Sequence, residues 1–182
     1  MTELELNRAI RALVRLCTGI ADKDVRPANQ DAPAKGNFAT VLIMDSMAAG
    51  HDDDTWADVA GDPDDKVRET LRGQRTSVAS IQFFRVGARD LAEKFRTRVA
   101  LHDALYALQE SGIGFISVTP VRNLSAVVNS AWEDRAQLDM VFSYISTETV
   151  DIPSFGSFPI TVQTVPVEAQ PPVNQSSEVF EP

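Results

Sequence analysis

The stretch Leu138-Asp139-Met140-Val141-Phe142-Ser143-Tyr144-Ile145 decides the fold class. Its larger side chains recur at every second position: Leu138, Met140, Phe142 and Tyr144. This period of two is that of a β-strand with one buried face, since successive side chains point to opposite sides of a sheet. A strand needs paired neighbours to be stable. The stretch therefore predicts a sheet with this strand in its core.

Further strands are expected on either side of this stretch. Alternation and apolar runs predict them over residues 38–47, 66–73, 74–84, 115–121 and 158–165. Gly73 separates the second and third of these strands and is expected to turn one into the other as a hairpin. Residues 123–131 are expected to form a loop or a strand edge, and residues 25–37 a loop.

The N-terminal segment has a helical pattern over residues 2–18. Its apolar positions share helical spacing: Leu6, Ile10, Leu13 and Cys17. Thr2 and Glu5 match a capping box, in which the two residues satisfy each other's free backbone donors at a helix start. Gly19 is suited to ending the helix. Shorter helices are expected over residues 87–99 and 103–110.

The order of these elements predicts an α+β fold: a mostly antiparallel sheet flanked by an N-terminal helix and one or two central helices. Residues 1–165 are expected to form this domain. From residue 166 the chain is rich in Pro, Gln and Ser, so residues 166–182 are expected to form an extended or disordered C-terminal arm. The arm still carries spaced apolar residues, Val179 and Phe180 among them, which are candidates for docking on another protein.

Composition limits the classes of function. The chain of 182 residues has a net charge of −9, which argues against tight binding of nucleic acid by the domain as a whole. No apolar run approaches the roughly 20 residues that cross a bilayer. The acidic start of the sequence does not resemble a secretory signal. The single cysteine, Cys17, falls on the apolar side of the first helix and is expected to be a buried, inert thiol.

The charges are unevenly distributed along the chain. Residues 52–65 hold many carboxylates and no Lys or Arg, and no basic residue follows Arg135. Basic residues lie earlier, over residues 66–98 and on the first helix at Arg8, Arg11 and Arg15. Separated acidic and basic regions allow copies of one chain to attract each other. The alternative is that these arginines only form a solvated helix face.

Residues 49–65 are expected to form an acidic loop. Its carboxylates, which include Asp52, Asp53 and Asp54, could supply oxygens for calcium, but they lack the spacing of an EF-hand. We therefore expect a solvated loop and no metal site. Trp56 within the loop is expected either to pack back on the domain or to mark a contact with a partner.

Motifs for catalysis are missing. The sequence has no zinc-type Cys/His spacing, no phosphate loop, no nucleophile elbow and no dinucleotide fingerprint. We expect a protein that is not an enzyme, with no catalytic residues and no cofactor, and that acts by contact with other proteins.

The run from Trp132 to Tyr144, in which Trp132, Arg135 and Asp139 lead into the alternating strand, resembles the neck or tail-terminator proteins of long-tailed bacteriophages. The first helix, the segment Arg26-Pro27-Ala28-Asn29-Gln30 and the segment Ser80-Ile81-Gln82-Phe83-Phe84 follow in the same order as in that family. Trp132 and Arg135 are candidates for a contact between subunits, but packing at a helix-to-strand joint within one subunit is the favoured interpretation.

The resemblance implies a ring, usually of six copies, on the head-proximal end of the tail tube. Such a ring ends tube growth and joins the tail to the head. The implied partners are further copies, the tail tube protein, head connector or head-completion proteins and a sheath protein, with DNA passing through the lumen without specific binding. The implied location is the virion, and the host cytoplasm during assembly. The alternatives are another ring component, such as a head-completion or baseplate protein, and a small hydrolase.

Overall fold

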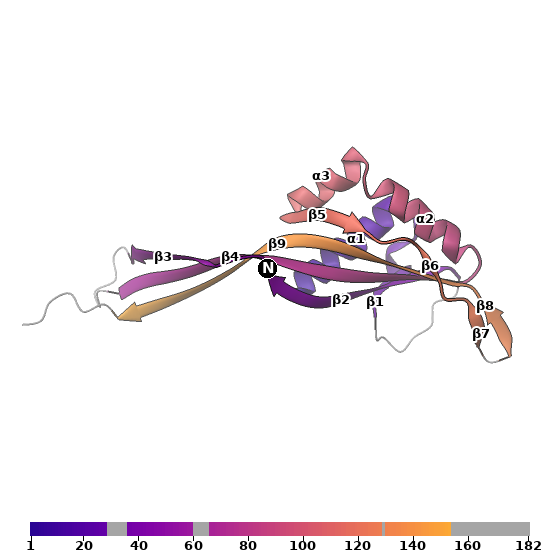
Figure 1. The fold of residues 1–182 in the computed structure, drawn as a ribbon, viewed down its shortest axis with the longest axis horizontal. Helices are drawn as coiled ribbons and strands as arrows, with labels where there is room; N and C mark the ends of the chain where they lie inside the picture. The colour runs from indigo at the N-terminus through magenta and orange to yellow at the C-terminus, as the bar shows by residue number, and fades with distance from the viewer. Residues whose placement is uncertain (29–35, 60–65, 129, 154–182) are drawn as a thin grey trace, which may run out of the picture.

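The computed structural model describes residues 1–28, 36–59, 66–128 and 130–153, and shows an α+β fold (Figure 1). The helices are α1 (Glu3–Thr18), the 3-10 turn η1 (Asp22–Asp24), α2 (Ala88–Arg98) and α3 (His102–Glu110). The strands are β1 (Val25–Pro27), β2 (Phe38–Ala48), β3 (Asp53–Asp58), β4 (Lys66–Phe84), β5 (Ile113–Val118), β6 (Arg122–Asn123), β7 (Ala126–Val128), β8 (Ala131–Glu133) and β9 (Arg135–Pro153). The predicted fold class is confirmed.

One main sheet organises the molecule. Its strands are ordered β1-β2-β4-β9-β5, with β3 added to β4 and β6 added to β9, while β7 and β8 form a separate two-stranded sheet. All these pairs are antiparallel except β1 with β2. The prediction of a mostly antiparallel sheet is thus confirmed.

Two long strands, β4 and β9, form the central ribbon of the sheet. Each has 19 residues, and they pair along their full length without a register shift, from Lys66 opposite Pro153 to Phe84 opposite Arg135. The predicted hairpin at Gly73 is wrong, because Gly73 is paired with Ser146 inside β4 and is not a turn residue. A tight hairpin turn usually needs two suitable residues, and Gly73 is a single glycine. Because β9 pairs with β4 on both sides of Gly73, the strand continues straight through it.

The helices cover one face of the sheet in the half away from β3, and the core lies between the helices and this face (Figure 1). The buried side chains of the central strands alternate as expected: Ala79, Ile81 and Phe83 on β4, and Leu138, Met140 and Phe142 on β9. From α1, Leu6, Ile10, Leu13 and Cys17 are buried against this face. The predicted period of two over residues 138–145 therefore identified the core strand correctly.

The ends of α1 follow their predicted chemistry. The Glu5 amide donates to Thr2 Oγ1 over 3.3 Å, and the Thr2 amide donates to Glu5 Oε2 over 2.8 Å. Gly19 has a φ of +81° and its amide donates to the Arg15 carbonyl, which closes the helix in the left-handed conformation that glycine adopts easily. Both the capping box and the glycine stop are confirmed.

The sheet extends well beyond the helices. The distal halves of β4 and β9, together with β3, form a three-stranded projection that points away from the rest of the molecule (Figure 1). We call this part, residues 53–58, 66–74 and 145–153, the blade, and the helices with the proximal sheet the body.

The predicted acidic loop over residues 49–65 is wrong for Asp53–Asp58, which forms β3 and pairs with β4 from Asp53 opposite Arg72 to Asp58 opposite Val67. Asp is unfavourable in strands, but backbone pairing with an existing neighbour overrides that preference. Residues 123–131, predicted as a loop or strand edge, contribute instead to β6 and to the β7–β8 hairpin, whose turn includes Ser130 with a φ of +63°.

Other expectations lie partly or wholly outside the described residues. Residues 25–27 are a strand, not a loop. The predicted strand over residues 158–165 and the predicted arm over residues 166–182 are outside the part that the structure describes. Within the described ranges, every helix is too short or too polar to cross a membrane.

Candidate interaction surfaces

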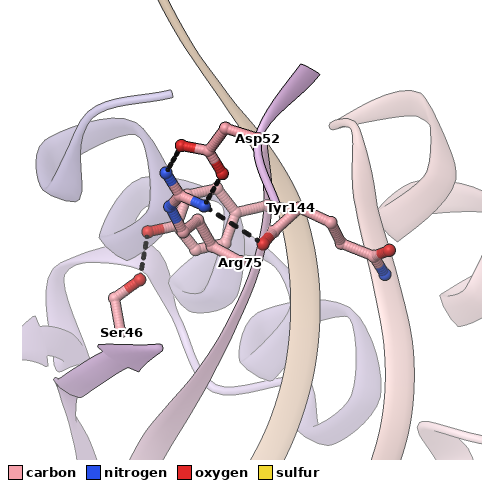
Figure 2. A network of polar contacts seen from close by, with 5 residues as sticks. Ser46, Asp52, Arg75 and Tyr144 are labelled. Atoms are coloured by element: carbon pink, nitrogen blue, oxygen red, sulfur yellow. Dashed lines mark hydrogen bonds and ion pairs between the residues drawn. The ribbon is translucent and has the colours of Figure 1, made fainter. Parts of the chain in front are cut away.

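A polar network fixes the root of the blade to the body (Figure 2). Arg75 of β4 donates two hydrogen bonds to the Asp52 carboxylate, from Nη1 and Nη2, each over 2.5 Å. In the same cluster the hydroxyls of Ser46 and Tyr144 lie 2.8 Å apart. The hydrogen bonding from Arg75 lowers the pKa of Asp52. The Asp52–Arg75 pair therefore joins the residue before β3 to β4, and the Ser46–Tyr144 pair joins β2 to β9.

Gly73 leaves room for the Asp52–Arg75 pair. A Cβ atom at this position would overlap the Asp52 carboxylate and lie 2.5 Å from Arg75 Nη1. The ion pair can cross the sheet face here only because β4 has no side chain at this point. Gly73 thus permits a close approach and does not serve as a turn.

One face of the blade is acidic and apolar. Residues directly opposite in antiparallel strands share a face, so the register places nine side chains together: Asp54, Trp56 and Asp58 of β3, Val67, Glu69 and Leu71 of β4, and Glu148, Val150 and Ile152 of β9. We call this set the acidic-apolar face. It holds four carboxylates and no basic residue. Trp56, Leu71 and Val150 are 57%, 42% and 52% exposed.

The acidic-apolar face continues the core face of the body. Because β4 and β9 pair without a register shift, the odd positions of β4 and the even positions of β9 stay on one side from the core to the blade tip. Helices cover these positions in the body. On the blade the described residues leave them uncovered, around a hollow of about 180 Å³ lined by Glu69, Leu71, Glu148, Thr149 and Val150.

The opposite face of the blade is polar and largely self-neutralised. It carries Lys66, Arg68 and Arg72 of β4. Arg68 lies opposite Asp151, and Arg72 lies opposite Asp53 and Thr147. Arg68 binds Asp151 through two hydrogen bonds, of 2.7 and 3.0 Å. The two faces therefore differ sharply in charge and in apolar content.

The three arginines of α1 share a second surface. Arg8 is exposed, Arg11 and Arg15 are partly exposed, and Arg15 forms an ion pair with Asp22. No carboxylate of the described residues lies within salt-bridge distance of Arg8 or Arg11. Burial lowers the pKa of Arg11, and the charges of Arg15 and Arg8 add to this shift. The surface thus carries poorly neutralised positive charge.

An open groove of about 710 Å³ runs along this side of α1. Its lining residues are Met1, Glu5, Arg8, Ala9, Ala12, Arg15, Ser111 and Ile145. Small and apolar side chains form much of the groove, and Arg8 and Arg15 supply its positive charge. We call it the α1 groove. Glu5, its one carboxylate, already accepts the backbone hydrogen bond from Thr2.

Trp132 and Arg135 lie at the end of the sheet opposite to the blade. Trp132 is exposed, whereas Arg135 packs within the chain. Trp132 is 68% exposed on β8, and its indole donates to Asp134 over 2.9 Å. The expectation that Trp132 packs within the subunit is therefore wrong, because the β7–β8 hairpin carries it into solvent. Arg135 does pack within the chain: its guanidinium lies 4.8 Å from the ring centre of Phe84 and donates to Gln82.

The predicted site residues thus form several surfaces. Asp52, Asp53, Asp54 and Trp56 lie at or on β3, but Asp53 and Asp54 point to opposite faces of the blade. Val179 and Phe180 are outside the described residues.

The sequence interpretation missed Glu69, Leu71, Glu148 and Val150. Their alternation along β4 and β9 could have indicated them, had the two strands been recognised as continuous.

The described residues suggest no catalytic chemistry. They contain no group of three or more His, Cys, Asp or Glu side chains arranged to hold a metal ion. Burial raises the pKa of the Cys17 thiol to about 11, so the thiol is protonated near neutral pH and is a poor nucleophile. The surfaces described above are suited to protein contacts.

Comparison with known proteins supplies the family. Residues 4–166 match the family described as "Phage neck terminator protein". No curated protein matches the sequence. Among solved structures, a chain of the "Virion of native gene transfer agent (GTA) particle" is similar at 14% identity, with a TM-score of 0.25, over 78% of this chain and 92% of that one. The matched family is one of structural virion proteins, not enzymes. Since the match spans most of the sequence, the chain belongs to the family of phage neck terminator proteins.

Proposed function

We infer that the protein forms a ring at the head-proximal end of the phage tail tube, where it ends tube growth and joins the tail to the head. The observation that carries this proposal is the family match over residues 4–166. The ring would contain six identical copies. It would contact the tail tube protein on one side and head connector or head-completion proteins on the other, and a sheath protein is a further candidate partner.

The surfaces of the chain support a role in assembly. A ring of identical copies needs two different patches on each copy that fit each other. The blade and the α1 groove are two such patches, with opposite charge. The net charge of −9 is also compatible with a lumen through which DNA slides, because an acidic wall does not release counterions from the phosphates.

The test is tail assembly without this protein. A phage that carries an early stop codon in the gene is expected to produce tail tubes of irregular length that fail to join heads. Adding the purified chain should restore tubes of defined length with a ring at one end, seen by negative-stain electron microscopy. Tails of normal length that join heads in the absence of the protein would contradict the proposal.

A further inference from the structure

The acidic-apolar face of the blade is built like a core face and is not covered by the described residues. It lies on the same side of β4 and β9 as Ile81, Phe83, Met140 and Phe142, which α1, α2 and α3 cover in the body. Exposed apolar side chains arranged in this way mark a contact surface. Because carboxylates lie beside these apolar side chains, a surface that binds here should be positively charged.

The α1 groove has the matching properties. Ala9 and Ala12 allow close approach, and Met1 and Ile145 add apolar surface. Arg8 supplies the positive charge, next to Arg15, which is paired with Asp22. Arg8 has no salt-bridge partner among the described residues. The spacings are of similar size: Arg8 and Arg15 are about 10 Å apart along the helix axis, and Asp54 and Asp58 are about 13 Å apart along β3.

One copy cannot satisfy both surfaces by itself, because the blade points away from the body (Figure 1). We propose that the acidic-apolar face of one copy docks in the α1 groove of the next copy. Each copy then contacts one neighbour through its blade and the other neighbour through its α1 groove. This inference rests on the proposed ring and names the surfaces that form it. The contact is heterologous, the kind that closes into a ring when the rotation between copies allows it.

The test uses two charge reversals in the full-length chain. Arg8→Glu reverses the groove and Glu148→Arg reverses the blade; both residues are exposed, and neither has a hydrogen bond or ion pair to another side chain among the described residues. Each single variant is expected to lose at least about tenfold in self-association, measured by analytical ultracentrifugation at low salt, because like charges meet at the contact. Unchanged thermal unfolding of the variants would show that the fold is intact.

Mixing the two variants gives the sharpest result. In an alternating ring, the reversed groove of one variant meets the reversed blade of the other, and the remaining contacts are wild type. An equimolar mixture should therefore associate nearly as well as the wild type, although neither variant does alone. The matched control is Asp53→Arg, which makes the same charge change on the opposite face of the blade and should associate normally.

Several outcomes would overturn the proposed contact: normal association of either single variant, a mixture that stays dissociated, or an equal loss in Asp53→Arg. If Glu148→Arg associates normally but binds tubes poorly, the occupant is the tube protein. If it associates normally while residues 154–182 become sensitive to protease, the occupant is the chain's own C-terminal segment.

The same samples, mixed with tail tubes, separate this contact from the proposed function. If the wild type and the mixture associate but neither caps tubes, the contact stands and the proposed function fails. If the variants cap tubes as well as the wild type does, the function stands and the contact fails. Wild-type protein that associates neither in solution nor on tubes would refute the contact.

Discussion

Phe142 lies at the centre of the core. It is fully buried on β9, between the helices and the sheet, and its ring centre lies 6.2 Å from that of Tyr144. Phe142→Ala removes most of this side chain and leaves a cavity, so we expect a loss of roughly 3–5 kcal/mol in the free energy of unfolding. Urea denaturation would measure it. Val150→Ala on the same strand is the control and should cost less than about 0.5 kcal/mol in the isolated chain.

The pKa of Asp52 shows whether the Asp52–Arg75 pair at the root of the blade is formed. Hydrogen bonds from Arg75 hold its pKa below the ordinary value of 3.8. A lowered carboxyl pKa stabilises the fold above that ordinary value, and the stabilisation disappears as the pH falls through the folded-state pKa. We therefore expect Arg75→Gln to destabilise the protein slightly near neutral pH and to have no effect in strong acid.

Carboxyl NMR titration would measure this directly. Arg75→Gln should return the pKa of Asp52 towards 3.8, whereas the pKa of Asp151, which is lowered by the hydrogen bond from Arg68, should stay where it is. An unchanged pKa of Asp52 in this variant would show that the pair does not form in solution.

At the scale of the element, α1 depends on its N-terminal cap. Thr2 and Glu5 satisfy each other's backbone amides, and the helix packs its apolar side on the sheet. Thr2→Ala should cost about 1 kcal/mol of stability, because a free amide at the helix start loses its acceptor. Thr2→Ser keeps the hydroxyl and should cost much less. Equal losses in the two variants, measured by thermal unfolding, would argue against the capping role.

The attachment of β3 depends on Gly73. In Gly73→Ala the new methyl group would displace the Asp52 carboxylate from Arg75, so β3 should open more often. Hydrogen exchange of the β3 amides is expected to become faster, while exchange in the β4–β9 ribbon of the body stays unchanged. In an Asp52→Ala background the same change should have little further effect, since two residues in contact do not act additively. Full additivity would mean that Gly73 acts through another contact.

At the scale of the whole molecule, residues 166–182, the predicted C-terminal arm, are a further candidate for a partner contact. Residues 166–182 contain the apolar residues Val173, Val179 and Phe180 at intervals, with Glu178 and Glu181 and no basic residue. Such a segment is suited to adding to a sheet edge or a groove of a basic partner. We expect limited proteolysis to cleave the arm faster in the free protein than in assembled tails. Equal cleavage rates, together with normal assembly of a chain ending at Val165, would contradict a docking role.

Much of the body follows from local patterns in the sequence. The period of two over residues 138–145 and the helical spacing of Leu6, Ile10, Leu13 and Cys17 identified which sides are buried, because the geometry of a strand or helix decides which side chains share a face. The capping box and the glycine stop were also predictable, since each involves residues within one helical turn.

The blade was decided by tertiary structure. No local pattern shows that β4 continues through Gly73, because that requires β9 to pair beside it over the full 19 residues. Nor does the Asp-rich sequence of β3 favour a strand; its pairing with β4 and the Asp52–Arg75 ion pair hold it there.

The acidic-apolar face combines side chains from three segments far apart in the chain. The sequence alone shows that carboxylates and apolar residues occupy every second position of each segment. Only the register of the three strands decides that they gather on one side, with Lys66, Arg68 and Arg72 of β4 on the other, since a shift of one residue would move every side chain to the opposite face.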